Sequence, residues 1–299
     1  MEGHYLVKKI IQSIFSIKNI GNHKVLTILG IKIKFKRAND SKKDDDVLNY
    51  LEVDIVDHCN LNCSGCTHFC PLVGENYMDV EQFKKDLLQL KTFFSEIRQF
   101  RILGGEPLLH KDIAKFVQYS REILPNSDIR IVTNGLLLSK MPDEFFDAVK
   151  KYNVILDLSK YPVAGEKFSD ALDKIGEKEC QLGFIHLCKK FWLALISDGS
   201  QDKEDSFKRC THKNCKSLKN GRLYICPPAA FMPRYNKYFN KNIPWDNGID
   251  IYNADKKQMK EYLKTPLETC RYCLSKKDFK FVPWKVSKRD ENEWFADKN

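Results

Sequence analysis

Three cysteines are the strongest chemical signal in this 299-residue chain. Cys59, Cys63 and Cys66 form a C-x3-C-x2-C run directly after the apolar segment 51–56, which predicts a buried strand. The thiols therefore follow the carboxyl end of a strand, where α/β sheets and barrels place their chemistry. Three thiolates are too few for a closed structural zinc site. They are enough to bind a [4Fe-4S] cluster through three of its irons and to leave the fourth iron open to a small molecule.

A second candidate site follows the next predicted strand. Residues 100–103 form a short apolar segment, and Gly104, Gly105 and Glu106 come directly after it. Two glycines let the backbone approach a ligand closely, and a carboxylate complements an ammonium group. By itself, such a sequence is typical of an ordinary turn. Its distance from Cys66, with one predicted helix between, is what a βαβ repeat requires.

The segments between and after these motifs alternate between helix and strand. Asp79, with Gln82 three residues later, predicts a capped helix whose apolar side continues through Phe94 and Ile97. Alternation of this kind predicts an α/β fold with a parallel sheet and right-handed crossovers over residues 47–203. The other expected elements are helices over 113–124 and 142–152 and strands over 129–133, 154–159, 184–188 and 191–196.

This combination of motifs resembles the radical SAM superfamily. In that family, C-x3-C-x2-C after the first strand of a partial (β/α)6 barrel holds a [4Fe-4S] cluster. Its open iron binds the amino and carboxylate groups of S-adenosylmethionine (SAM). The resemblance implies that an electron from the cluster cleaves SAM and that the resulting 5′-deoxyadenosyl radical abstracts a substrate hydrogen. It also implies an external electron donor of the flavodoxin or ferredoxin type. The protein then positions and shields its cofactors.

The resemblance assigns SAM contacts to further residues. In the family, the Gly-Gly-Glu motif hydrogen-bonds the SAM amino group, and other strand ends contact the ribose or the carboxylate. The family also has an aromatic residue just before the third cysteine, where this chain has Gly65. His68 or Phe69 is the expected substitute for packing on adenine. The strand-end positions are matched by Thr133, Asn134 and Ser159, for which an ordinary turn and an ordinary hydroxyl are the alternatives.

The remaining cysteines include a second group. The chain has 11 cysteines and no recognisable signal peptide, which favours metal binding in the cytosol over disulfides. Asn220-Gly221 between short apolar segments predicts a hairpin. With Cys210 and Cys226 it resembles the hairpin of the twitch domain, a short form of the SPASM extension that holds one auxiliary [4Fe-4S] cluster. The expected domain spans 204–299, with ligands Cys210, Cys226, Cys270 and Cys273 and with Cys215 as a possible replacement for Cys210. A zinc ribbon is the alternative.

Two residues on the predicted strand 184–188 are candidate catalytic groups. Phe184, His186 and Cys188 share one face of this strand. If that face lines the barrel, His186 and Cys188 lie near the substrate. A core histidine and an inert thiol are the alternative. Cys70 and Cys180 are expected to be small buried apolar residues.

Residues 1–46 form a basic appendage and linker. Residues 1–37 contain seven Lys, one Arg and one Glu, so they supply +7 of the formal net charge of +10. Residues 5–15 predict a basic amphipathic helix, and residues 24–37 predict a hairpin or strand. Because basic and apolar residues occur together, a membrane surface is favoured as the partner over nucleic acid. A solvated basic hairpin packed on the barrel is the alternative. No apolar run is long enough to span a membrane.

A shorter resemblance suggests where the protein works. The segment 23–35 resembles terminal segments of bacterial capsule and lipopolysaccharide glycosyltransferases. It implies a cytoplasmic protein, peripheral at the inner membrane, beside the machinery of polysaccharide biosynthesis. Among twitch enzymes are dehydrogenases that oxidise a sugar-like alcohol. We therefore expect a radical oxidoreductase acting on a nucleotide- or lipid-linked sugar. A sugar epimerase using a thiol such as Cys188, a peptide-modifying enzyme and a non-catalytic zinc-binding membrane adaptor are the alternatives.

Overall fold

The chain divides into two compact units, Met1–Asp44 and Asp45–Asn299. The computed structural model describes residues 15–20, 23–28, 31–36 and 46–298. In the first unit, β1 (Phe15–Ile20), β2 (His23–Ile28) and β3 (Ile31–Lys36) form an antiparallel sheet in that order. The hairpin predicted over 24–37 is thus confirmed. The helix predicted over 5–15 lies outside the described residues except for Phe15, which belongs to β1.

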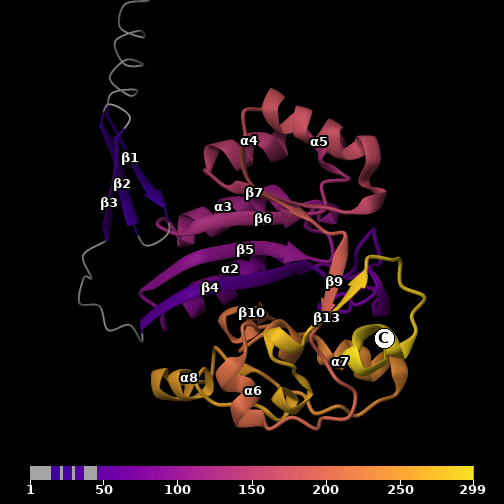
Figure 1. Ribbon diagram of the computed structural model, residues 1–299. Helices are drawn as coiled ribbons and strands as arrows, with labels where there is room; N and C mark the ends of the chain where they lie inside the picture. The colour runs from indigo at the N-terminus through magenta and orange to yellow at the C-terminus, as the bar shows by residue number, and fades with distance from the viewer. Residues whose placement is uncertain (1–14, 21–22, 29–30, 37–45, 299) are drawn as a thin grey trace, which may run out of the picture. The chain divides into compact units, whose positions relative to one another are not determined.

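The second unit is built on one eight-stranded sheet with the order β12-β11-β10-β4-β5-β6-β7-β8. Five successive strands are parallel, as the α/β prediction requires, and Figure 1 shows them stacked through the middle of this unit. They are β4 (Val47–Val56), β5 (Glu96–Gly104), β6 (Asp128–Thr133), β7 (Ile155–Lys160) and β8 (Gln181–Leu187).

Helices cover one face of these parallel strands and form the main core with it. Alternate residues of β4, such as Leu51 and Val53, are fully buried in one cluster with Phe83 and Leu87 of α2. Asp79 caps α2 by accepting from the Gln82 amide at 2.8 Å, as predicted. The covering helices are α2 (Val80–Leu90), α3 (Ile113–Ile123), α4 (Asp143–Lys151) and α5 (Gly165–Glu177).

One helix boundary differs from the prediction. The apolar spacing predicts a helix that continues through Phe94 and Ile97, but α2 ends at Leu90 and Ile97 lies in β5. Both residues are buried in the same core as the helix. Ile97 of β5 falls by coincidence at the helical spacing of α2. An apolar pattern reports burial and does not by itself distinguish a helix from a strand.

The segment predicted as a sixth barrel strand leaves the sheet. Residues 191–196 contain β9 (Lys190–Leu193), which pairs antiparallel with β13 (Lys280–Pro283). Only two residues separate β8 from β9. A parallel crossover needs a dozen residues or more, so β9 cannot pair with β8 in parallel. The strand on the free side of β4 is instead β10 (Lys216–Lys219), which is parallel to β4.

The C-terminal residues extend this sheet beyond β4. β10 and β11 (Arg222–Tyr224) form the predicted hairpin, and its turn residues Asn220 and Gly221 have φ angles of 50° and 69°. β12 (Ile249–Asp250) completes the sheet. Figure 1 shows α6 (Lys203–Arg209), α7 (Pro227–Phe239) and α8 (Lys256–Tyr262) on the side of β4 and β10, opposite α4 and α5.

Candidate functional site

Two of the predicted motifs pack directly against each other at the carboxyl ends of β4 and β5. Gly105 donates to the Val56 carbonyl at 2.8 Å, and the Glu106 amide donates to the His58 carbonyl at 3.1 Å. A Cβ added at Gly105 would stand 1.9 Å from the His58 carbonyl oxygen. No other residue fits this approach, so the glycine is needed to bring the second loop against the loop that carries the cysteines.

The Glu106 carboxylate joins the second loop to the third. It is 1% exposed and accepts from the Thr133 hydroxyl at 2.6 Å, the Asn134 amide at 2.9 Å and the Leu108 amide at 3.1 Å. Burial raises the pKa of Glu106 to about 7, although these donors act in the opposite direction. The side chain predicted to meet the SAM amino group thus holds Thr133 and Asn134 in place.

The third loop also reaches the cysteines. The Asn134 side-chain amide donates to the Asn60 side-chain oxygen at 2.7 Å and lies 4.0 Å from the Cys59 sulfur. Asn60 is a site residue that the sequence analysis missed. Two of the predicted SAM-binding segments, the loop at Glu106 and the loop at Asn134, therefore meet beside the cysteine run.

The three thiols have different surroundings. Burial raises the pKa of Cys59 and Cys63 to about 12, and a hydrogen bond from the Cys70 thiol lowers the pKa of Cys66 to about 6. In the described part of the chain, no three His, Cys, Asp or Glu side chains converge on a single metal ion. In a [4Fe-4S] cluster each thiolate binds a different iron, so its ligands are spaced more widely than those of one ion. The loop fits such a cluster by its donor set and by its convergence with the other loops.

Two tryptophans from the end of the chain contact the cysteine run. The Trp284 indole donates to the Cys63 sulfur at 3.1 Å, and the Trp294 indole donates to the Cys66 carbonyl at 2.9 Å. The Ser64 amide also donates to the Lys285 carbonyl at 3.0 Å. Trp284 is 221 positions from Cys63, so no local spacing in the sequence could reveal this contact.

The two rings predicted to pack on adenine, those of His68 and Phe69, stack on other side chains of the protein instead. Phe69 is fully buried, with its ring 5.7 Å from Trp294, and offers no free face. His68 stacks on Phe231 at 4.6 Å. Gly65, which stands where the family has an aromatic residue, has a φ of +72°, and a Cβ there would lie 2.9 Å from a Leu193 methyl carbon. The positive φ and the close packing against Leu193 thus explain why this position holds glycine and not an aromatic residue.

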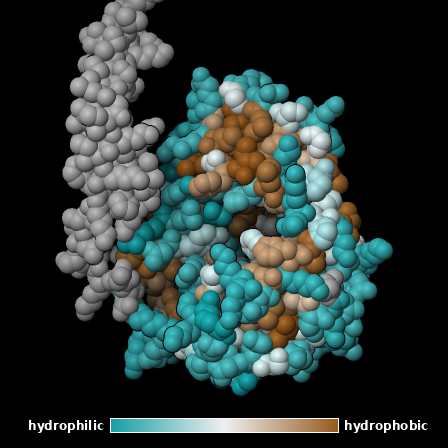
Figure 2. Space-filling model, viewed as in Figure 1, coloured by the Kyte–Doolittle hydropathy of each residue, from teal (hydrophilic) through white to brown (hydrophobic). Residues whose placement is uncertain are grey.

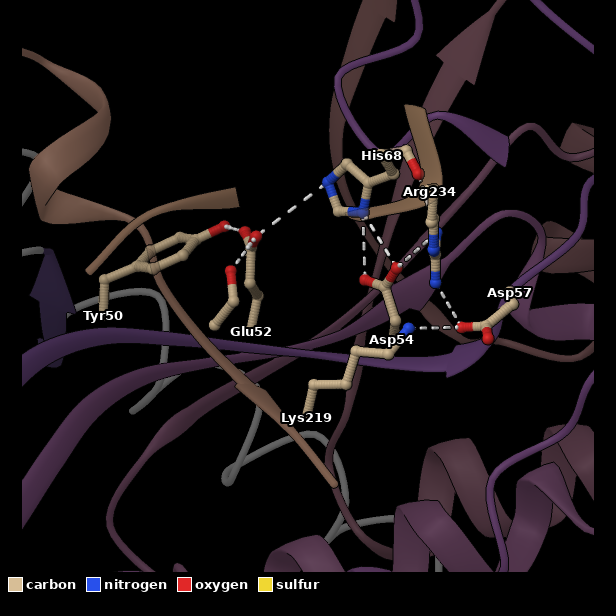
Figure 3. A network of polar contacts seen from close by, with 8 residues as sticks. Tyr50, Glu52, Asp54, Asp57, His68, Lys219 and Arg234 are labelled. Carbon is tan, nitrogen blue, oxygen red and sulfur yellow. Dashed lines mark hydrogen bonds and ion pairs between the residues drawn. The ribbon is translucent and has the colours of Figure 1, made fainter. Parts of the chain in front are cut away.

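His68 belongs to a buried charge network, shown in Figure 3. Its Nδ1 lies 3.0 Å from both carboxylate oxygens of Asp54, and its Nε2 lies 3.9 Å from Glu52. Burial disfavours the charged imidazolium, yet the two carboxylates raise the pKa of His68 to about 9. From α7, Arg234 donates to the His68 carbonyl at 2.7 Å and pairs with Asp57. The network fastens the cysteine loop to β4 and α7.

The face of the sheet opposite the helices is charged. Because side chains alternate along a strand, Glu52 and Asp54 of β4 point away from the core residues Leu51 and Val53. On the neighbouring strands, Arg130 pairs with Asp157 at 3.0 Å. We call this surface, with Tyr50, Glu52, Asp54, Arg101, Arg130 and Asp157, the inner face. Figure 2 shows a hollow in the middle of this view of the unit.

Two further predicted residues lie close together at the end of this face. Ser159 pairs in register with His186, so their side chains share one side of the sheet. The Cys188 pKa is raised by burial and lowered by hydrogen bonds to Tyr161 and Ser159. Tyr161 in turn lies 6.0 Å from the Trp284 ring. Cys188 therefore lies near the cysteine run, and His186 lies on the exposed strand β8.

Four of the five C-terminal cysteines line one pocket. Cys210, Cys226, Cys270 and Cys273 surround about 410 Å³ of space that opens to solvent, together with apolar side chains such as Phe207 and Leu267. Cys215 does not line this pocket. Burial and the nearby Glu52 raise the pKa of Cys215 to about 11, which places this thiol beside the inner face.

Comparisons with known proteins agree with this geometry. Residues 53–180 match the model of the radical SAM superfamily. The chain is 31% identical over 140 residues to GTP 3′,8-cyclase of Sulfurimonas denitrificans, which is 44% of each chain. It is 34% identical over 136 residues to that of Aliarcobacter butzleri, covering 44% of this chain and 41% of the relative. The chain thus spans less than half the length of these curated relatives.

Two solved structures are similar over most of the chain. One is BtrN in complex with AdoMet and 2-DOIA, with a TM-score of 0.49, 17% identity and coverage of 77% of this chain and 94% of that chain. The other is anSMEcpe with bound AdoMet and the Cp18Cys peptide, with a TM-score of 0.48, 13% identity and coverage of 78% and 85%.

Proposed function

We propose that the chain is an iron–sulfur enzyme that uses SAM and oxidises an alcohol of a carbohydrate substrate at the inner face, because residues 53–180 match the radical SAM superfamily model. One observation carries the proposal. The cysteine run, the loop at Glu106 and the loop at Asn134 meet at one edge of the sheet, directly beside a sheet face lined with charged and hydroxyl groups. Such a face suits a substrate with many hydroxyl groups, because each polar group then finds a partner.

The residues present fit the cofactors. Cys59, Cys63 and Cys66 would hold the cluster, and the backbone at Gly104 and Gly105 with Thr133 and Asn134 would hold SAM. When bound, these cofactors supply a 5′-deoxyadenosyl radical that takes one hydrogen atom from carbon. The protein's part is to place the carbinol carbon of the sugar at that position and to receive the hydroxyl proton, for which the inner face offers carboxylates.

The second cysteine group supports oxidation. Cys210, Cys226, Cys270 and Cys273 line one pocket, and we infer that they bind an auxiliary [4Fe-4S] cluster, with Cys215 outside it. A second cluster supplies an acceptor for the electron that alcohol oxidation releases. The auxiliary site belongs to residues 204–299, which we retain as a twitch-like segment although β10 to β12 continue the barrel's sheet.

Two other reactions are second candidates. The position of Cys188 near Tyr161 and the cysteine run favours an epimerase, in which a thiol returns a hydrogen to the opposite face of the sugar. The names of the curated relatives favour a purine nucleotide as substrate. However, the match covers less than half of each chain, so we do not carry the substrate of these relatives over to this protein. A peptide substrate has no specific support, and the match to an enzyme family argues against a non-catalytic zinc adaptor.

The test uses the anaerobically purified enzyme with a chemical reductant and SAM. UDP-hexoses, hexose phosphates and GTP, each deuterated at the candidate carbons, are supplied separately. Mass spectrometry then follows deuterium transfer into 5′-deoxyadenosine. A sugar product lighter by two hydrogens supports oxidation, and an inverted centre of unchanged composition supports epimerisation. Deuterium transfer from GTP alone would overturn the carbohydrate proposal.

The proposed partners follow from the same chemistry. An external donor of the flavodoxin or ferredoxin type would reduce the clusters. We also retain an anionic membrane surface or a glycosyltransferase of polysaccharide biosynthesis as the partner of the basic N-terminal unit, because β3 alternates Lys32, Lys34 and Lys36 with apolar residues. In the part of the chain that the structure describes, none of the helices has the length and apolar character of a membrane span.

A further inference from the structure

Arg101 occupies the centre of the inner face. It lies on β5, in register with Glu52 on β4 and with Arg130 on β6. Residues in register on neighbouring strands point to the same side of a sheet. Arg101 also precedes Gly104 by three positions on the same strand, which corresponds to roughly 10 Å. A ligand bound at Arg101 can therefore also reach the loop at Gly104.

Among the residues that the structure describes, none forms a hydrogen bond with the Arg101 guanidinium. Its Nε is buried without a partner. Its nearest carboxylate is that of Asp157, and the distance from Nη2 to Oδ2 is 3.6 Å, which is too long for a hydrogen bond. A guanidinium carries five N–H donors. The side chain is 22% exposed, so a ligand can reach it.

The neighbouring charges do not satisfy Arg101, because they are already engaged with one another. Asp157 accepts from Arg130 at 3.0 Å and from the Phe184 amide at 2.9 Å. Arg130 is also held by both carboxylate oxygens of Asp128. Arg130 thus hydrogen-bonds through all three of its nitrogens, whereas Arg101 has no such partner among the described residues.

The other side of Arg101 is closed by Tyr50 and Glu52. The Tyr50 ring centre lies 5.4 Å from the guanidinium carbon, which orients the guanidinium. The Glu52 carboxylate accepts from the Tyr50 hydroxyl at 2.7 Å and from the Ser217 hydroxyl at 2.9 Å. Glu52 is therefore engaged as well, and the free donors of Arg101 are left for a ligand.

We propose that Arg101 binds an oxyanion group of the substrate, a phosphate or a carboxylate, and so determines which carbohydrates are accepted. The planar guanidinium matches the geometry of either group, and an unpaired buried donor favours a ligand that supplies acceptors. The inference rests on the proposed function. It adds that the substrate is a sugar phosphate, a nucleotide sugar or a uronic acid that is bound through this group.

The test measures binding of two simple probes to the SAM-loaded holoenzyme by anaerobic calorimetry. Pyrophosphate stands for a phosphate-bearing substrate and glucuronate for a carboxylate-bearing one. Arg101→Gln should weaken binding of the preferred probe at least tenfold. Arg101→Lys should weaken it less, because it keeps the charge and loses only the planar fork. The probe that binds the wild-type enzyme identifies the anion.

A matched control separates this effect from a general loss of positive charge. Arg98→Gln changes an exposed arginine on the same strand, where it pairs with Glu96, and should leave probe binding unchanged. Substrate-free SAM cleavage should be the same in all variants, which shows that the loops stay intact. Equal binding by the wild type and Arg101→Gln, or no binding of either probe to the wild type, would overturn the inference. Oxidation of an uncharged sugar with wild-type efficiency would overturn it while leaving the proposed function standing.

Discussion

At the scale of single residues, the three cysteines after β4 are the first test of the site. We expect alanine at Cys59, Cys63 or Cys66 to abolish formation of 5′-deoxyadenosine, because each change removes one ligand of the cluster that cleaves SAM. Product chromatography after anaerobic incubation with a reductant measures this. Cys180→Ala is the matched control, since this thiol packs against the main core and hydrogen-bonds to backbone carbonyls such as that of Phe146. SAM cleavage by a triple alanine variant would show that the assignment of the cluster is wrong.

Trp284 gives a second prediction, because its indole donates to the Cys63 sulfur. Hydrogen bonds to cluster sulfurs stabilise the more negatively charged reduced form. Trp284→Phe should therefore make the reduction potential of the cluster more negative, as measured by redox titration followed by electron paramagnetic resonance. Trp192→Phe is the control, since Trp192 lies on the adjacent strand β9 and is half exposed. An unchanged potential in Trp284→Phe would contradict the expected role.

Glu106 gives a pH dependence. Its pKa rises from 4.5 in a model compound to about 7 in the folded protein, so between these values the folded protein holds a proton that the unfolded chain has lost. The stabilisation is therefore complete below pH 4.5 and is lost as the pH rises through about 7. It amounts to at most about 3 kcal/mol. Anaerobic urea unfolding from pH 5 to 8 should show this loss.

The control for the pH series is the same substitution, Glu to Gln, at an exposed position. Glu106→Gln should remove the loss of stability between pH 5 and 6.5, because above that range His68, with its pKa raised from 6.5 to about 9, also contributes. Glu122→Gln, which changes an exposed residue on α3, should retain the full pH dependence. A Glu106→Gln variant with the same pH profile as the wild type would mean that another group titrates.

At the scale of elements, the pocket between α6, α7 and the C-terminal loops determines the iron content. With two [4Fe-4S] clusters the protein should contain about eight irons. Alanine at Cys226 or Cys273 should reduce this to about four, because both thiols line the pocket. Cys215→Ala should leave it near eight, because Cys215 lies outside. Iron and zinc analysis measures the outcome, and zinc in the pocket would favour the ribbon alternative.

Elements with local signals could be predicted from the sequence. Asp79 and Gln82 define the start of α2, and Asn220-Gly221 defines the turn between β10 and β11. These signals act within a few residues, so they are visible in one chain. The helix α5 is absent from the predictions although Phe168, Ala171 and Ile175 follow helical spacing and are buried.

Contacts between distant segments could not be predicted in this way. The pairing of β9 with β13, the burial of Phe69 and the contact of Trp284 with Cys63 all depend on residues near the C-terminus. For the same reason, the motifs located the cysteine run and the loop at Glu106 but not the unpaired Arg101. That feature depends on which neighbours Asp157 and Glu52 already bind.

At the scale of the whole molecule, the division at residues 44 and 45 separates catalysis from the basic unit. A protein lacking residues 1–44 should still cleave SAM, because the strands, loops and cysteines of the site lie in Asp45–Asn299. It should no longer bind vesicles containing anionic lipid, since the deletion removes the basic residues. Each contributes about 1 kcal/mol near such a surface, and salt screens the attraction.

Vesicle sedimentation and a SAM-cleavage assay measure the two properties on the same preparation. Vesicles of neutral lipid serve as the control for charge, and full-length protein at high salt serves as the control for screening. Undiminished vesicle binding after the deletion would contradict a membrane role. Loss of SAM cleavage would show instead that the first unit supports the fold of the second.

The parallel pairing of β4 with β10 has a consequence for protein synthesis. Ser217 on β10 meets Glu52 on β4 across 165 residues of chain, so this side of β4 has no partner until the ribosome has made β10. At ordinary rates of translation this takes on the order of 10–30 s. An unpaired strand edge invites pairing with other chains, and charged residues that point inward oppose it. We therefore expect Glu52 and Asp54 to oppose such pairing of the nascent chain before β10 is made.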